Sequence, residues 1–353
     1  MGAKQEKALF YFIVEPIVNM RALPDGASKV VSQALMGEEI RVCQKEKGWA
    51  WIQTPDGYFG WVPLGSFTES SIAYLGEETV SVTRLSGHIY SVADVEFGPK
   101  MTVAYGTRLK WIDDCDPRWT RIAFPNGEEG FIQKGDVAGE KPIRSKKDLI
   151  SLGKRFLGLP YTWGGRSSFG YDCSGFVQML YGRLGFLLPR DSIDQSRDAR
   201  LIPIEIGACE PGDLLFFGKN QDRIQHVALF IGKGAFIHAS SKENKPYLRI
   251  SRLTDAEWSG ALSASYPYRT ARSLLTNGPE KEESHRDFRT HHHDNPVKMA
   301  IDKTFHALSP KRHGCSDKRK TEESREGHIS DERKDPQVEN SGRKTQCFKR
   351  EGE

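Results

Sequence analysis

The tetrapeptide Asp172-Cys173-Ser174-Gly175 stands at the start of a helix-patterned run and so places a cysteine where a helix begins. Apolar residues then recur at steps of three and four, as on the buried stripe of a helix: Phe176, Val177, Leu180, Tyr181 and Leu184. Asp172 is a good N-cap, so Cys173 is expected in the first helical turn. There, free backbone N–H groups and the helix dipole favour a thiolate, the nucleophilic form of cysteine.

Two histidines follow on short β-rich apolar runs that flank a Gly-Lys-Gly turn at 232–234. The pattern predicts an antiparallel hairpin. With the hairpin centred on Gly232, His226 is expected to pair with His238, with Cβ atoms about 4.5–5.5 Å apart on one face. One imidazole could then hydrogen-bond the other, whereas a slip of one residue would put them on opposite faces.

Each of these residues also has a structural interpretation. A lone cysteine or histidine of this kind is most often a buried core residue. A zinc site of Cys173, His226 and His238 is a further alternative, but structural zinc usually takes four ligands and no fourth stands at suitable spacing. The three together favour a catalytic set that needs no metal and no other cofactor.

Five segments, in order, resemble the NlpC/P60 family of cell-wall cysteine peptidases. They are residues 156–165, 172–177, 188–192 with Gln195, 211–217 and the two histidine runs. The resemblance covers residues 145–270 and implies an α+β, papain-like domain in which the cysteine helix packs on an antiparallel sheet. It implies Cys173 as the nucleophile, His226 as the general base and acid, and His238 as the residue that orients His226.

Acyl transfer by such a set produces an oxyanion that must be stabilised. The Cys173 backbone N–H at the helix start is expected to meet it, helped by the Tyr161 hydroxyl. A helix is predicted at 145–158, and the Gly164-Gly165 turn after it would bring Tyr161 back near Cys173.

The first 140 residues show short alternating strands cut by Gly and Asp turns, which predicts small all-β barrels. Residues 11–68 resemble a bacterial SH3 domain. Residues 78–137 fit the same barrel without its opening motif and are interpreted as a diverged second copy. Either module could simply stabilise the protein, or could bind the wall or shape the substrate cleft.

Two such barrels ahead of this peptidase domain resemble the subgroup that cleaves between γ-D-glutamate and a diamino acid in murein peptides with a free N-terminal L-alanine. The resemblance implies that Asp172, Ser174 and Tyr58 hold the ammonium of that alanine. For Asp172 the N-cap role is equally expected, and the two roles are compatible. An acidic group beside the nucleophile otherwise raises the thiol pKa, so its presence is better explained if it also meets a substrate cation.

Two further motifs are predicted to be scaffold. Arg190-Asp191 precedes Ser192-x-x-Gln195, a capping-box pattern for a short helix. Asp213 follows a Pro-Gly turn and is expected to bond backbone rather than to act chemically.

Residues 271–353 are predicted to be a disordered tail whose partner is unknown. They hold 18 Lys/Arg and 16 Asp/Glu among 83 residues. Such a segment cannot bury enough apolar surface to offset chain ordering. Positive and negative charges are mixed along the segment, which argues against a basic arm that binds nucleic acid.

The N-terminal 20 residues show neither a secretory signal nor a membrane span, because Glu15 and Pro16 interrupt the apolar run 9–14. The six cysteines lack a pairing pattern, which suits a reducing compartment. A bacterial cytoplasmic enzyme that recycles murein peptides is therefore expected, with export to the periplasm or wall as the alternative. A murein-binding or scaffolding protein with an inactive peptidase domain is the other functional hypothesis.

Overall fold

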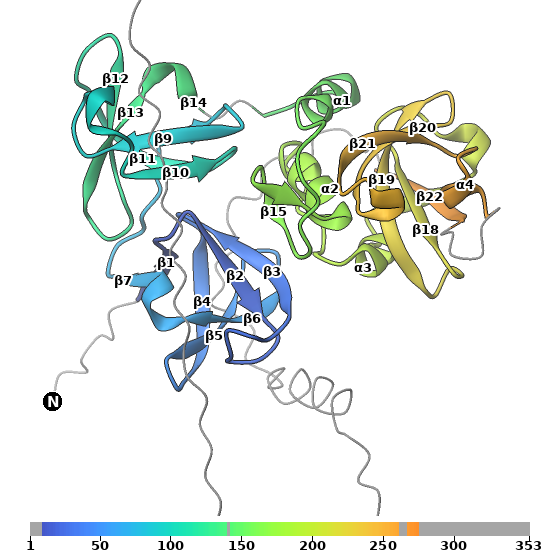
Figure 1. The fold of residues 1–353 in the computed structure, drawn as a ribbon, viewed down its shortest axis with the longest axis horizontal. Helices are drawn as coiled ribbons and strands as arrows, with labels where there is room; N and C mark the ends of the chain where they lie inside the picture. The colour runs from blue at the N-terminus through green and yellow to red at the C-terminus, as the bar shows by residue number, and fades with distance from the viewer. Residues whose placement is uncertain (1–8, 140–141, 261–266, 275–353) are drawn as a thin grey trace, which may run out of the picture. The chain divides into compact units, whose positions relative to one another are not determined.

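The computed structural model describes residues 9–139, 142–260 and 267–274. Two all-β modules come first in the chain, and a domain of helices and strands follows them (Figure 1). This arrangement confirms the predicted fold class. The predicted tail lies outside the described residues, except that 271–274 form the end of a strand.

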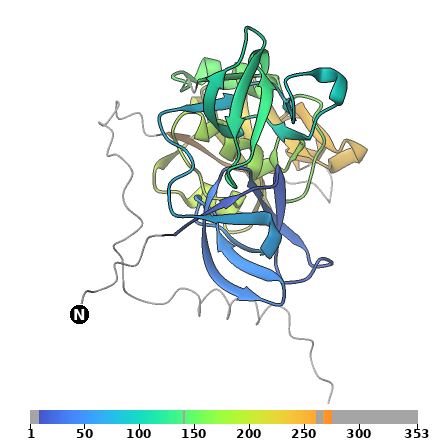
Figure 2. The ribbon, with the colours of Figure 1, turned by 90° about the vertical axis from the view of Figure 1, so that its left-hand side faces the viewer.

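The first module is a single seven-stranded sheet whose strands curve round a common core (Figure 2). Its core contains Ile13, Val18, Met20, Ile52 and Val62. The strands are β1 (Phe10–Ile13), β2 (Ile17–Arg21), β3 (Val30–Leu35), β4 (Glu39–Glu46), β5 (Trp49–Gln53), β6 (Phe59–Pro63) and β7 (Phe67–Ser70). They are ordered β3-β2-β6-β5-β4-β1-β7, with antiparallel pairing throughout.

The second module repeats the first strand for strand. Its order, β10-β9-β13-β12-β11-β8-β14, is the order of the first sheet with seven added to each label. A diverged second copy is expected to show this correspondence. Its strands are β8 (Thr79–Val82), β9 (Ser86–Tyr90), β10 (Met101–Ala104), β11 (Arg108–Asp114), β12 (Trp119–Ala123), β13 (Glu129–Gln133) and β14 (Val137–Gly139).

The third part is built on a six-stranded antiparallel sheet of order β17-β22-β18-β19-β20-β21. These strands are β17 (Leu201–Ile204), β18 (Leu214–Gly218), β19 (Ile224–Gly232), β20 (Ala235–Ser240), β21 (Tyr247–Arg252) and β22 (Tyr268–Leu274). Strands β15 (Arg166–Ser167) and β16 (Gly170–Tyr171) pair with each other as a short antiparallel ribbon. The helices are α1 (Lys146–Lys154), α2 (Cys173–Gly182), α3 (Ser192–Arg197) and α4 (Ala256–Ser259).

The sheet has a separate apolar cluster on each face, because side chains alternate along a strand. Val227, Leu229 and Ile237 belong to the cluster that contains Phe176 and Leu180 of α2. Ala228, Phe230 and Phe236 belong to the cluster that contains Trp258 of α4. The sheet is therefore covered on one face by α2, the helix that begins with Cys173, and on the other by α4, a single helical turn that contains Trp258.

Two predicted boundaries differ from the structure. Helix α1 ends at Lys154, four residues before the predicted end, and residues 155–158 form turns that finish at Gly158 with φ 89°. A positive φ is accessible to glycine and ends the helical path. Strand β22 runs past residue 270 to Leu274 because it pairs with β17 along its whole last half, with buried Ala271 facing the core.

The hairpin of β19 and β20 forms, but its turn is not centred on Gly232. Gly232 pairs with Ala235, so Lys233 and Gly234 are the two turn residues, with φ 52° and 68°. Two positive φ angles define the turn preferred in two-residue hairpins, because its twist matches that of the strands. A bulge between Phe230 and Gly232 adds one residue to β19.

The predicted pairing of His226 with His238 is therefore wrong. Leu229 pairs with Ile237, and this register continued along the strands sets Ala228 opposite His238. The shift is two residues, so both histidines remain on one face as diagonal neighbours.

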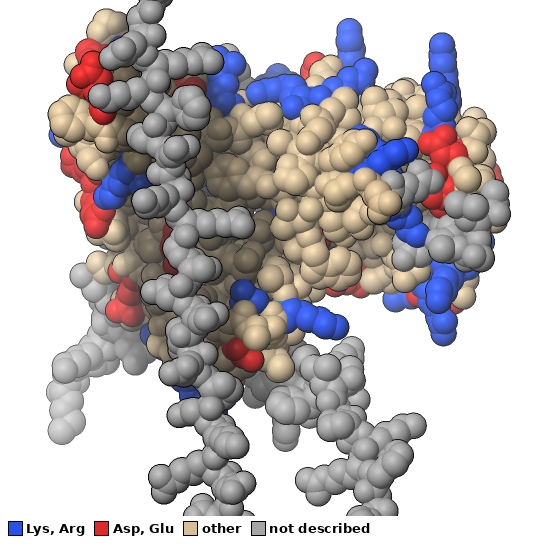
Figure 3. All heavy atoms as spheres, in the orientation of Figure 1, with Lys and Arg blue, Asp and Glu red and all other residues tan. Residues whose placement is uncertain are grey.

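Positive and negative side chains are interspersed on the face of the molecule in Figure 3, and much of that face carries neither. No helix in the described ranges combines the length and the apolar character needed to cross a membrane.

Gly175 lets the cysteine helix begin against the Gly164-Gly165 turn. A Cβ at Gly175 would lie 2.1 Å from the Gly165 carbonyl oxygen, whereas a Cβ at Gly182, in the last turn of the same helix, would meet nothing within 4 Å. We expect Gly175→Ala to destabilise this domain by about 3 kcal/mol, because backbone must move. Gly182→Ala, the matched control, should be neutral or stabilise by about 0.5 kcal/mol. Calorimetric melting of the two variants measures the difference, and equal melting temperatures would contradict this account.

Candidate active site

Cys173 is the first residue of α2, as the sequence predicted. Asp172 is its N-cap, and its Oδ1 accepts a hydrogen bond of 2.7 Å from the Gly175 N–H. The Cys173 sulfur lies against the backbone N–H of Val227, which favours the thiolate. This contact brings the predicted nucleophile next to the strand residue that follows His226.

Burial determines the protonation of this thiol. Desolvation, and then the charge of Asp172, raise the pKa of Cys173 to about 12, although the N–H groups of Val227 and Ser174 and the Arg190 cation act in the other direction. The helix start therefore does not make a thiolate at neutral pH by itself. The sulfur needs a base when it reacts.

His226 and His238 meet as predicted, despite the changed register. His226 Nε2 and His238 Nδ1 are 2.8 Å apart, and both rings are buried. Burial, followed by the cations Arg249 and Lys242, lowers the pKa of His226 to about 3. Burial, followed by His226 and Arg249, lowers the pKa of His238 well below its ordinary value. Both imidazoles are therefore neutral near pH 7.

Trp258 covers the histidine pair. Its ring stacks on His226 at a centroid distance of 4.7 Å and meets His238 edge to face at 4.9 Å. Phe217 and Phe236 complete this apolar surround. Nothing local in the sequence links Trp258 to either histidine, so this contact was not predicted.

Asp172 and Ser174 are held by Arg190, which was predicted to be scaffold. Arg190 Nη1 and Nη2 donate to the two carboxylate oxygens of Asp172 at 3.0 and 2.6 Å, and Nη1 also donates to Ser174 Oγ at 2.8 Å. The Gly164 N–H donates to Asp172 Oδ2 at 3.0 Å. The N-cap bond from the Gly175 N–H and a longer bond of 3.3 Å from Ser174 Oγ bring the number of hydrogen bonds that the Asp172 carboxylate accepts to five. Asp172 therefore has little capacity left for a substrate ammonium.

Tyr58 reaches the same region from the first module. Its hydroxyl donates to Asp191 Oδ2 at 3.1 Å. Burial raises the pKa of both Tyr58 and Asp191. Asp191 is only partly buried, so its carboxylate retains acceptor capacity beside a tyrosine hydroxyl.

The predicted capping box at Ser192 and Gln195 is wrong. The N-cap of α3 is Asp191, and its side chain makes no cap hydrogen bond. Gln195 Nε2 instead donates to the carbonyl oxygens of Ser174 and Pro189 at 3.1 and 2.8 Å. Tertiary packing brings these two acceptors to the side chain, which therefore does not reach back to the start of its own helix. Asp213 behaves as predicted and accepts the Glu210 N–H at 2.8 Å.

The first module also contacts the cysteine helix and the ribbon before it. Gln178 of α2 donates to Asp56 Oδ2 at 2.9 Å. Arg166 donates to the Gln33 carbonyl oxygen at 2.6 Å and to Glu38 Oε1 at 3.0 Å. These bonds join the cysteine helix and the ribbon to a module outside their own domain.

Tyr161 lies near the start of α2, where an isolated bridge pairs it with Tyr171, two residues before Cys173. Both Tyr161 and Cys173 pack against the same core. Within the described part of the chain, no three His, Cys, Asp or Glu side chains are grouped so that they could hold a metal ion.

A cysteine at a helix start, a hydrogen-bonded histidine pair on an antiparallel sheet and an α+β domain define a cysteine peptidase. The NlpC/P60 family model matches residues 158–265, and the model of the bacterial dipeptidyl-peptidase Sh3 domain matches residues 20–67. The chain belongs to the NlpC/P60 family and is a cysteine endopeptidase of that type.

Named relatives and a solved structure are similar to this chain. The γ-D-glutamyl-L-lysine dipeptidyl-peptidase of Bacillus cereus is 35% identical over 234 residues, which are 62% of this chain and 69% of the relative. The Bacillus subtilis protein of the same name is 28% identical over 249 residues, 67% of this chain and 80% of the relative. The crystal structure of an NlpC/P60 family protein from Bacillus cereus aligns with a TM-score of 0.64 at 27% identity, covering 76% of this chain and all of that one.

Proposed function

We propose that this peptidase hydrolyses the γ-D-glutamyl–diamino acid bond of peptidoglycan stem peptides, and that it prefers peptides with a free N-terminal L-alanine. The names of the two Bacillus relatives support the bond. The hydrogen-bonded Tyr58–Asp191 pair beside the nucleophile helix supports the preference for a free amine. The predicted cytoplasmic location remains a prediction.

We assign Cys173 as the nucleophile, His226 as the general base and acid, and His238 as the residue that orients His226. His226 Nε2 is engaged by His238, so Nδ1 is the nitrogen left to receive the Cys173 proton. A thiol with a pKa near 12 is not ionised at rest, so the proton passes to His226 as sulfur attacks the amide carbonyl. The imidazolium then protonates the departing amine, and water hydrolyses the thioester.

Two features stabilise the charges that appear in this step. The Cys173 backbone N–H at the start of α2 faces the developing oxyanion, with the Tyr161 hydroxyl as the predicted second donor. Trp258, stacked on His226, favours the imidazolium through a cation–π interaction, which offsets part of the cost of charging a buried ring.

Product analysis tests the proposed function directly. The purified chain is incubated with L-Ala-γ-D-Glu-L-Lys and L-Ala-γ-D-Glu-diaminopimelate, and products are identified by mass spectrometry. We expect L-Ala-γ-D-Glu and the free diamino acid. Absence of both products together with retained murein binding would instead establish a scaffolding protein.

Asp191 is assigned as the carboxylate that receives the substrate ammonium, in place of the saturated Asp172. Acetylating the N-terminus should lower kcat/KM by about 100-fold, because the site's polar groups lose their partner. Asp191→Asn should lower kcat/KM for the free peptide by about 10- to 100-fold, the value of a charge-assisted hydrogen bond, and leave the acetylated peptide little changed.

Asp194→Asn is the matched control, since Asp194 is an exposed acid three residues along the same helix. It should leave both rates near those of wild type. Equal losses for free and acetylated peptides in Asp191→Asn would remove the ammonium role from this residue.

A further inference from the structure

Ser251 ends a chain of hydrogen bonds that begins at the proposed base. His226 Nε2 lies 2.8 Å from His238 Nδ1, and His238 Nε2 lies 2.9 Å from Ser251 Oγ. All three side chains are buried. Each ring nitrogen of His238 thus has a side-chain partner, so the positions of the hydrogens along the chain depend on one another.

Strand register places Ser251 there. His238 pairs with Arg249, and Phe236 pairs with Ser251, across β20 and β21. Ser251 is therefore a diagonal neighbour of His238 on the same face, as His238 is of His226 across β19 and β20. Three adjacent strands contribute one residue each to the chain.

The direction of these hydrogen bonds decides whether His226 can act as a base. If Nδ1 of His226 is to accept a proton, its hydrogen must sit on Nε2 and donate to His238 Nδ1. His238 then has its own hydrogen on Nε2 and donates it to Ser251 Oγ. In the opposite direction Ser251 donates to His238, His238 donates to His226, and Nδ1 of His226 is already protonated.

We propose that Ser251 is a positioning residue that accepts the hydrogen of His238 Nε2 and so selects the tautomer that leaves Nδ1 of His226 free for the Cys173 proton. The inference rests on the proposed peptidase function. The transferred proton moves from Sγ to Nδ1 of His226, and the other two hydrogens remain on their nitrogens.

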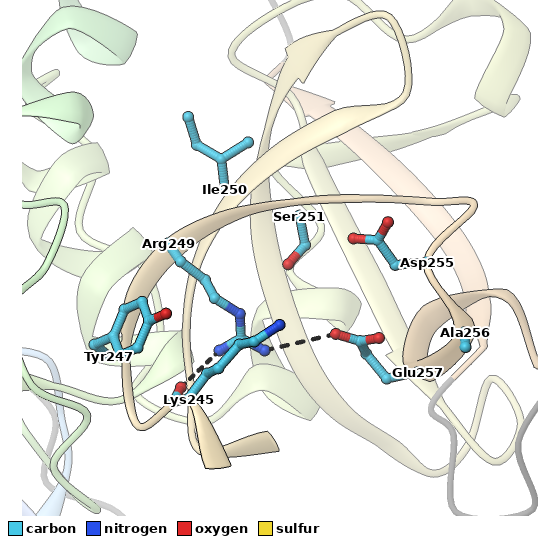
Figure 4. A pocket seen from close by; sticks show the side chains of 8 residues that line it. All are labelled: Lys245, Tyr247, Arg249, Ile250, Ser251, Asp255, Ala256 and Glu257. Carbon is cyan, nitrogen blue, oxygen red and sulfur yellow. Dashed lines mark hydrogen bonds and ion pairs between the residues drawn. The ribbon is translucent and has the colours of Figure 1, made fainter. Parts of the chain in front are cut away.

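A cavity of about 480 Å³ provides the environment that this direction requires (Figure 4). Ser251 lines it together with Asp255 and Glu257, so the serine hydroxyl can give its own hydrogen to solvent in the cavity while its oxygen accepts from His238.

The charged groups around the pair also suit neutral imidazoles. Two cations lie near the rings, Arg249 on β21 and Lys242 in the 3-10 helix Lys242–Asn244. Their charges disfavour a positive charge on either imidazole. Glu257 of α4 lies 3.8 Å from Arg249 and balances that cation rather than a histidine. The pair is thus kept uncharged, and only its tautomer is left for Ser251 to decide.

The tautomers can be observed without any assay of activity. Long-range 1H–15N correlation spectra of the full chain labelled with 15N-histidine distinguish protonated ring nitrogens from bare ones. We expect hydrogens on Nε2 of both His226 and His238 in the wild type. A hydrogen on Nδ1 of His226 would overturn the proposal, whichever bond the peptidase proves to cleave.

Kinetics of Ser251 variants give the second measurement. Ser251→Ala should lower kcat by about 10- to 100-fold with little change in KM, the usual effect of removing a residue that orients a functional histidine. Ser251→Thr keeps the hydroxyl and should restore most of the rate. Ser66→Ala, which removes another buried serine hydroxyl with a 3.1 Å bond to Glu15, should leave kcat unchanged.

The outcomes separate the two proposals. A wild-type chain that cleaves nothing refutes the proposed function, while the spectra still test the tautomer. An active chain whose Ser251→Ala variant keeps both the wild-type spectra and the wild-type kcat refutes the role of Ser251. If Ser251→Ala does not fold, the wild-type spectra and the kinetics of Ser251→Thr still test whether Ser251 selects the tautomer of His226.

Discussion

Cys173→Ala should lose essentially all peptidase activity, with kcat/KM lower by about 10⁴-fold or more, because no other group in the site can form the acyl-enzyme. The substituted side chain is small and apolar, so the variant should fold and still bind stem peptides. The measurement is release of the diamino acid from L-Ala-γ-D-Glu-L-Lys, with binding followed by calorimetry.

Cys209→Ala is the matched control. Cys209 is a second free, half-buried cysteine of the same domain, and burial raises the pKa of its thiol to about 11. It packs in the cluster on the far face of the sheet from α2. Its variant should keep wild-type activity, and substantial cleavage by Cys173→Ala would exclude Cys173 as the nucleophile.

Arg190→Met should have the largest effect on stability. It leaves the Asp172 carboxylate buried without its bidentate partner, and breaking a buried ion pair from one side typically costs about 3–5 kcal/mol. The hydrogen bonds from Arg190 to Ser174 and Ser32 are lost as well. Urea unfolding of the full chain, followed by fluorescence and circular dichroism together, measures the change in the free energy of unfolding.

Two further variants separate this cause from simple loss of packing. Arg197→Gln removes an exposed arginine that lies 3.9 Å from Asp222, and should change stability by less than about 0.5 kcal/mol because water screens such pairs. Adding Asp172→Asn to Arg190→Met removes the unpaired charge and should recover part of the loss. No recovery in the double variant would show that Arg190 acts through its packing rather than its charge.

The sequence predicted those features that depend on short-range patterns. Periodicity and the Asp172 cap located the helix that begins at Cys173, and β-rich runs located the two histidine strands. Family resemblance added the order of the parts and the fold class. Each of these signals lies within a few residues along the chain, where helix and strand geometry dictate the pattern.

Predictions that required a register or a choice of partner were less successful. The hairpin turn at residues 233–234 and its bulge moved the pairing by two residues, yet the two-residue repeat of a strand kept both histidines on one face. The same limit applies to Asp172, whose cap role was foreseen while its pairing with Arg190, 18 positions along the chain, was not.

By itself the sequence determined that a cysteine begins a buried helix and that two histidines share the face of a hairpin, because these follow from local periodicity. Only the tertiary structure decided what surrounds them. Arg190 forms an ion pair with Asp172, and Tyr58 of the first module donates a hydrogen bond to Asp191. Trp258 stacks on His226, and Ser251 hydrogen-bonds His238. Such contacts join distant segments, and desolvation, which sets the protonation of Cys173 and His226, arises only once the chain has packed.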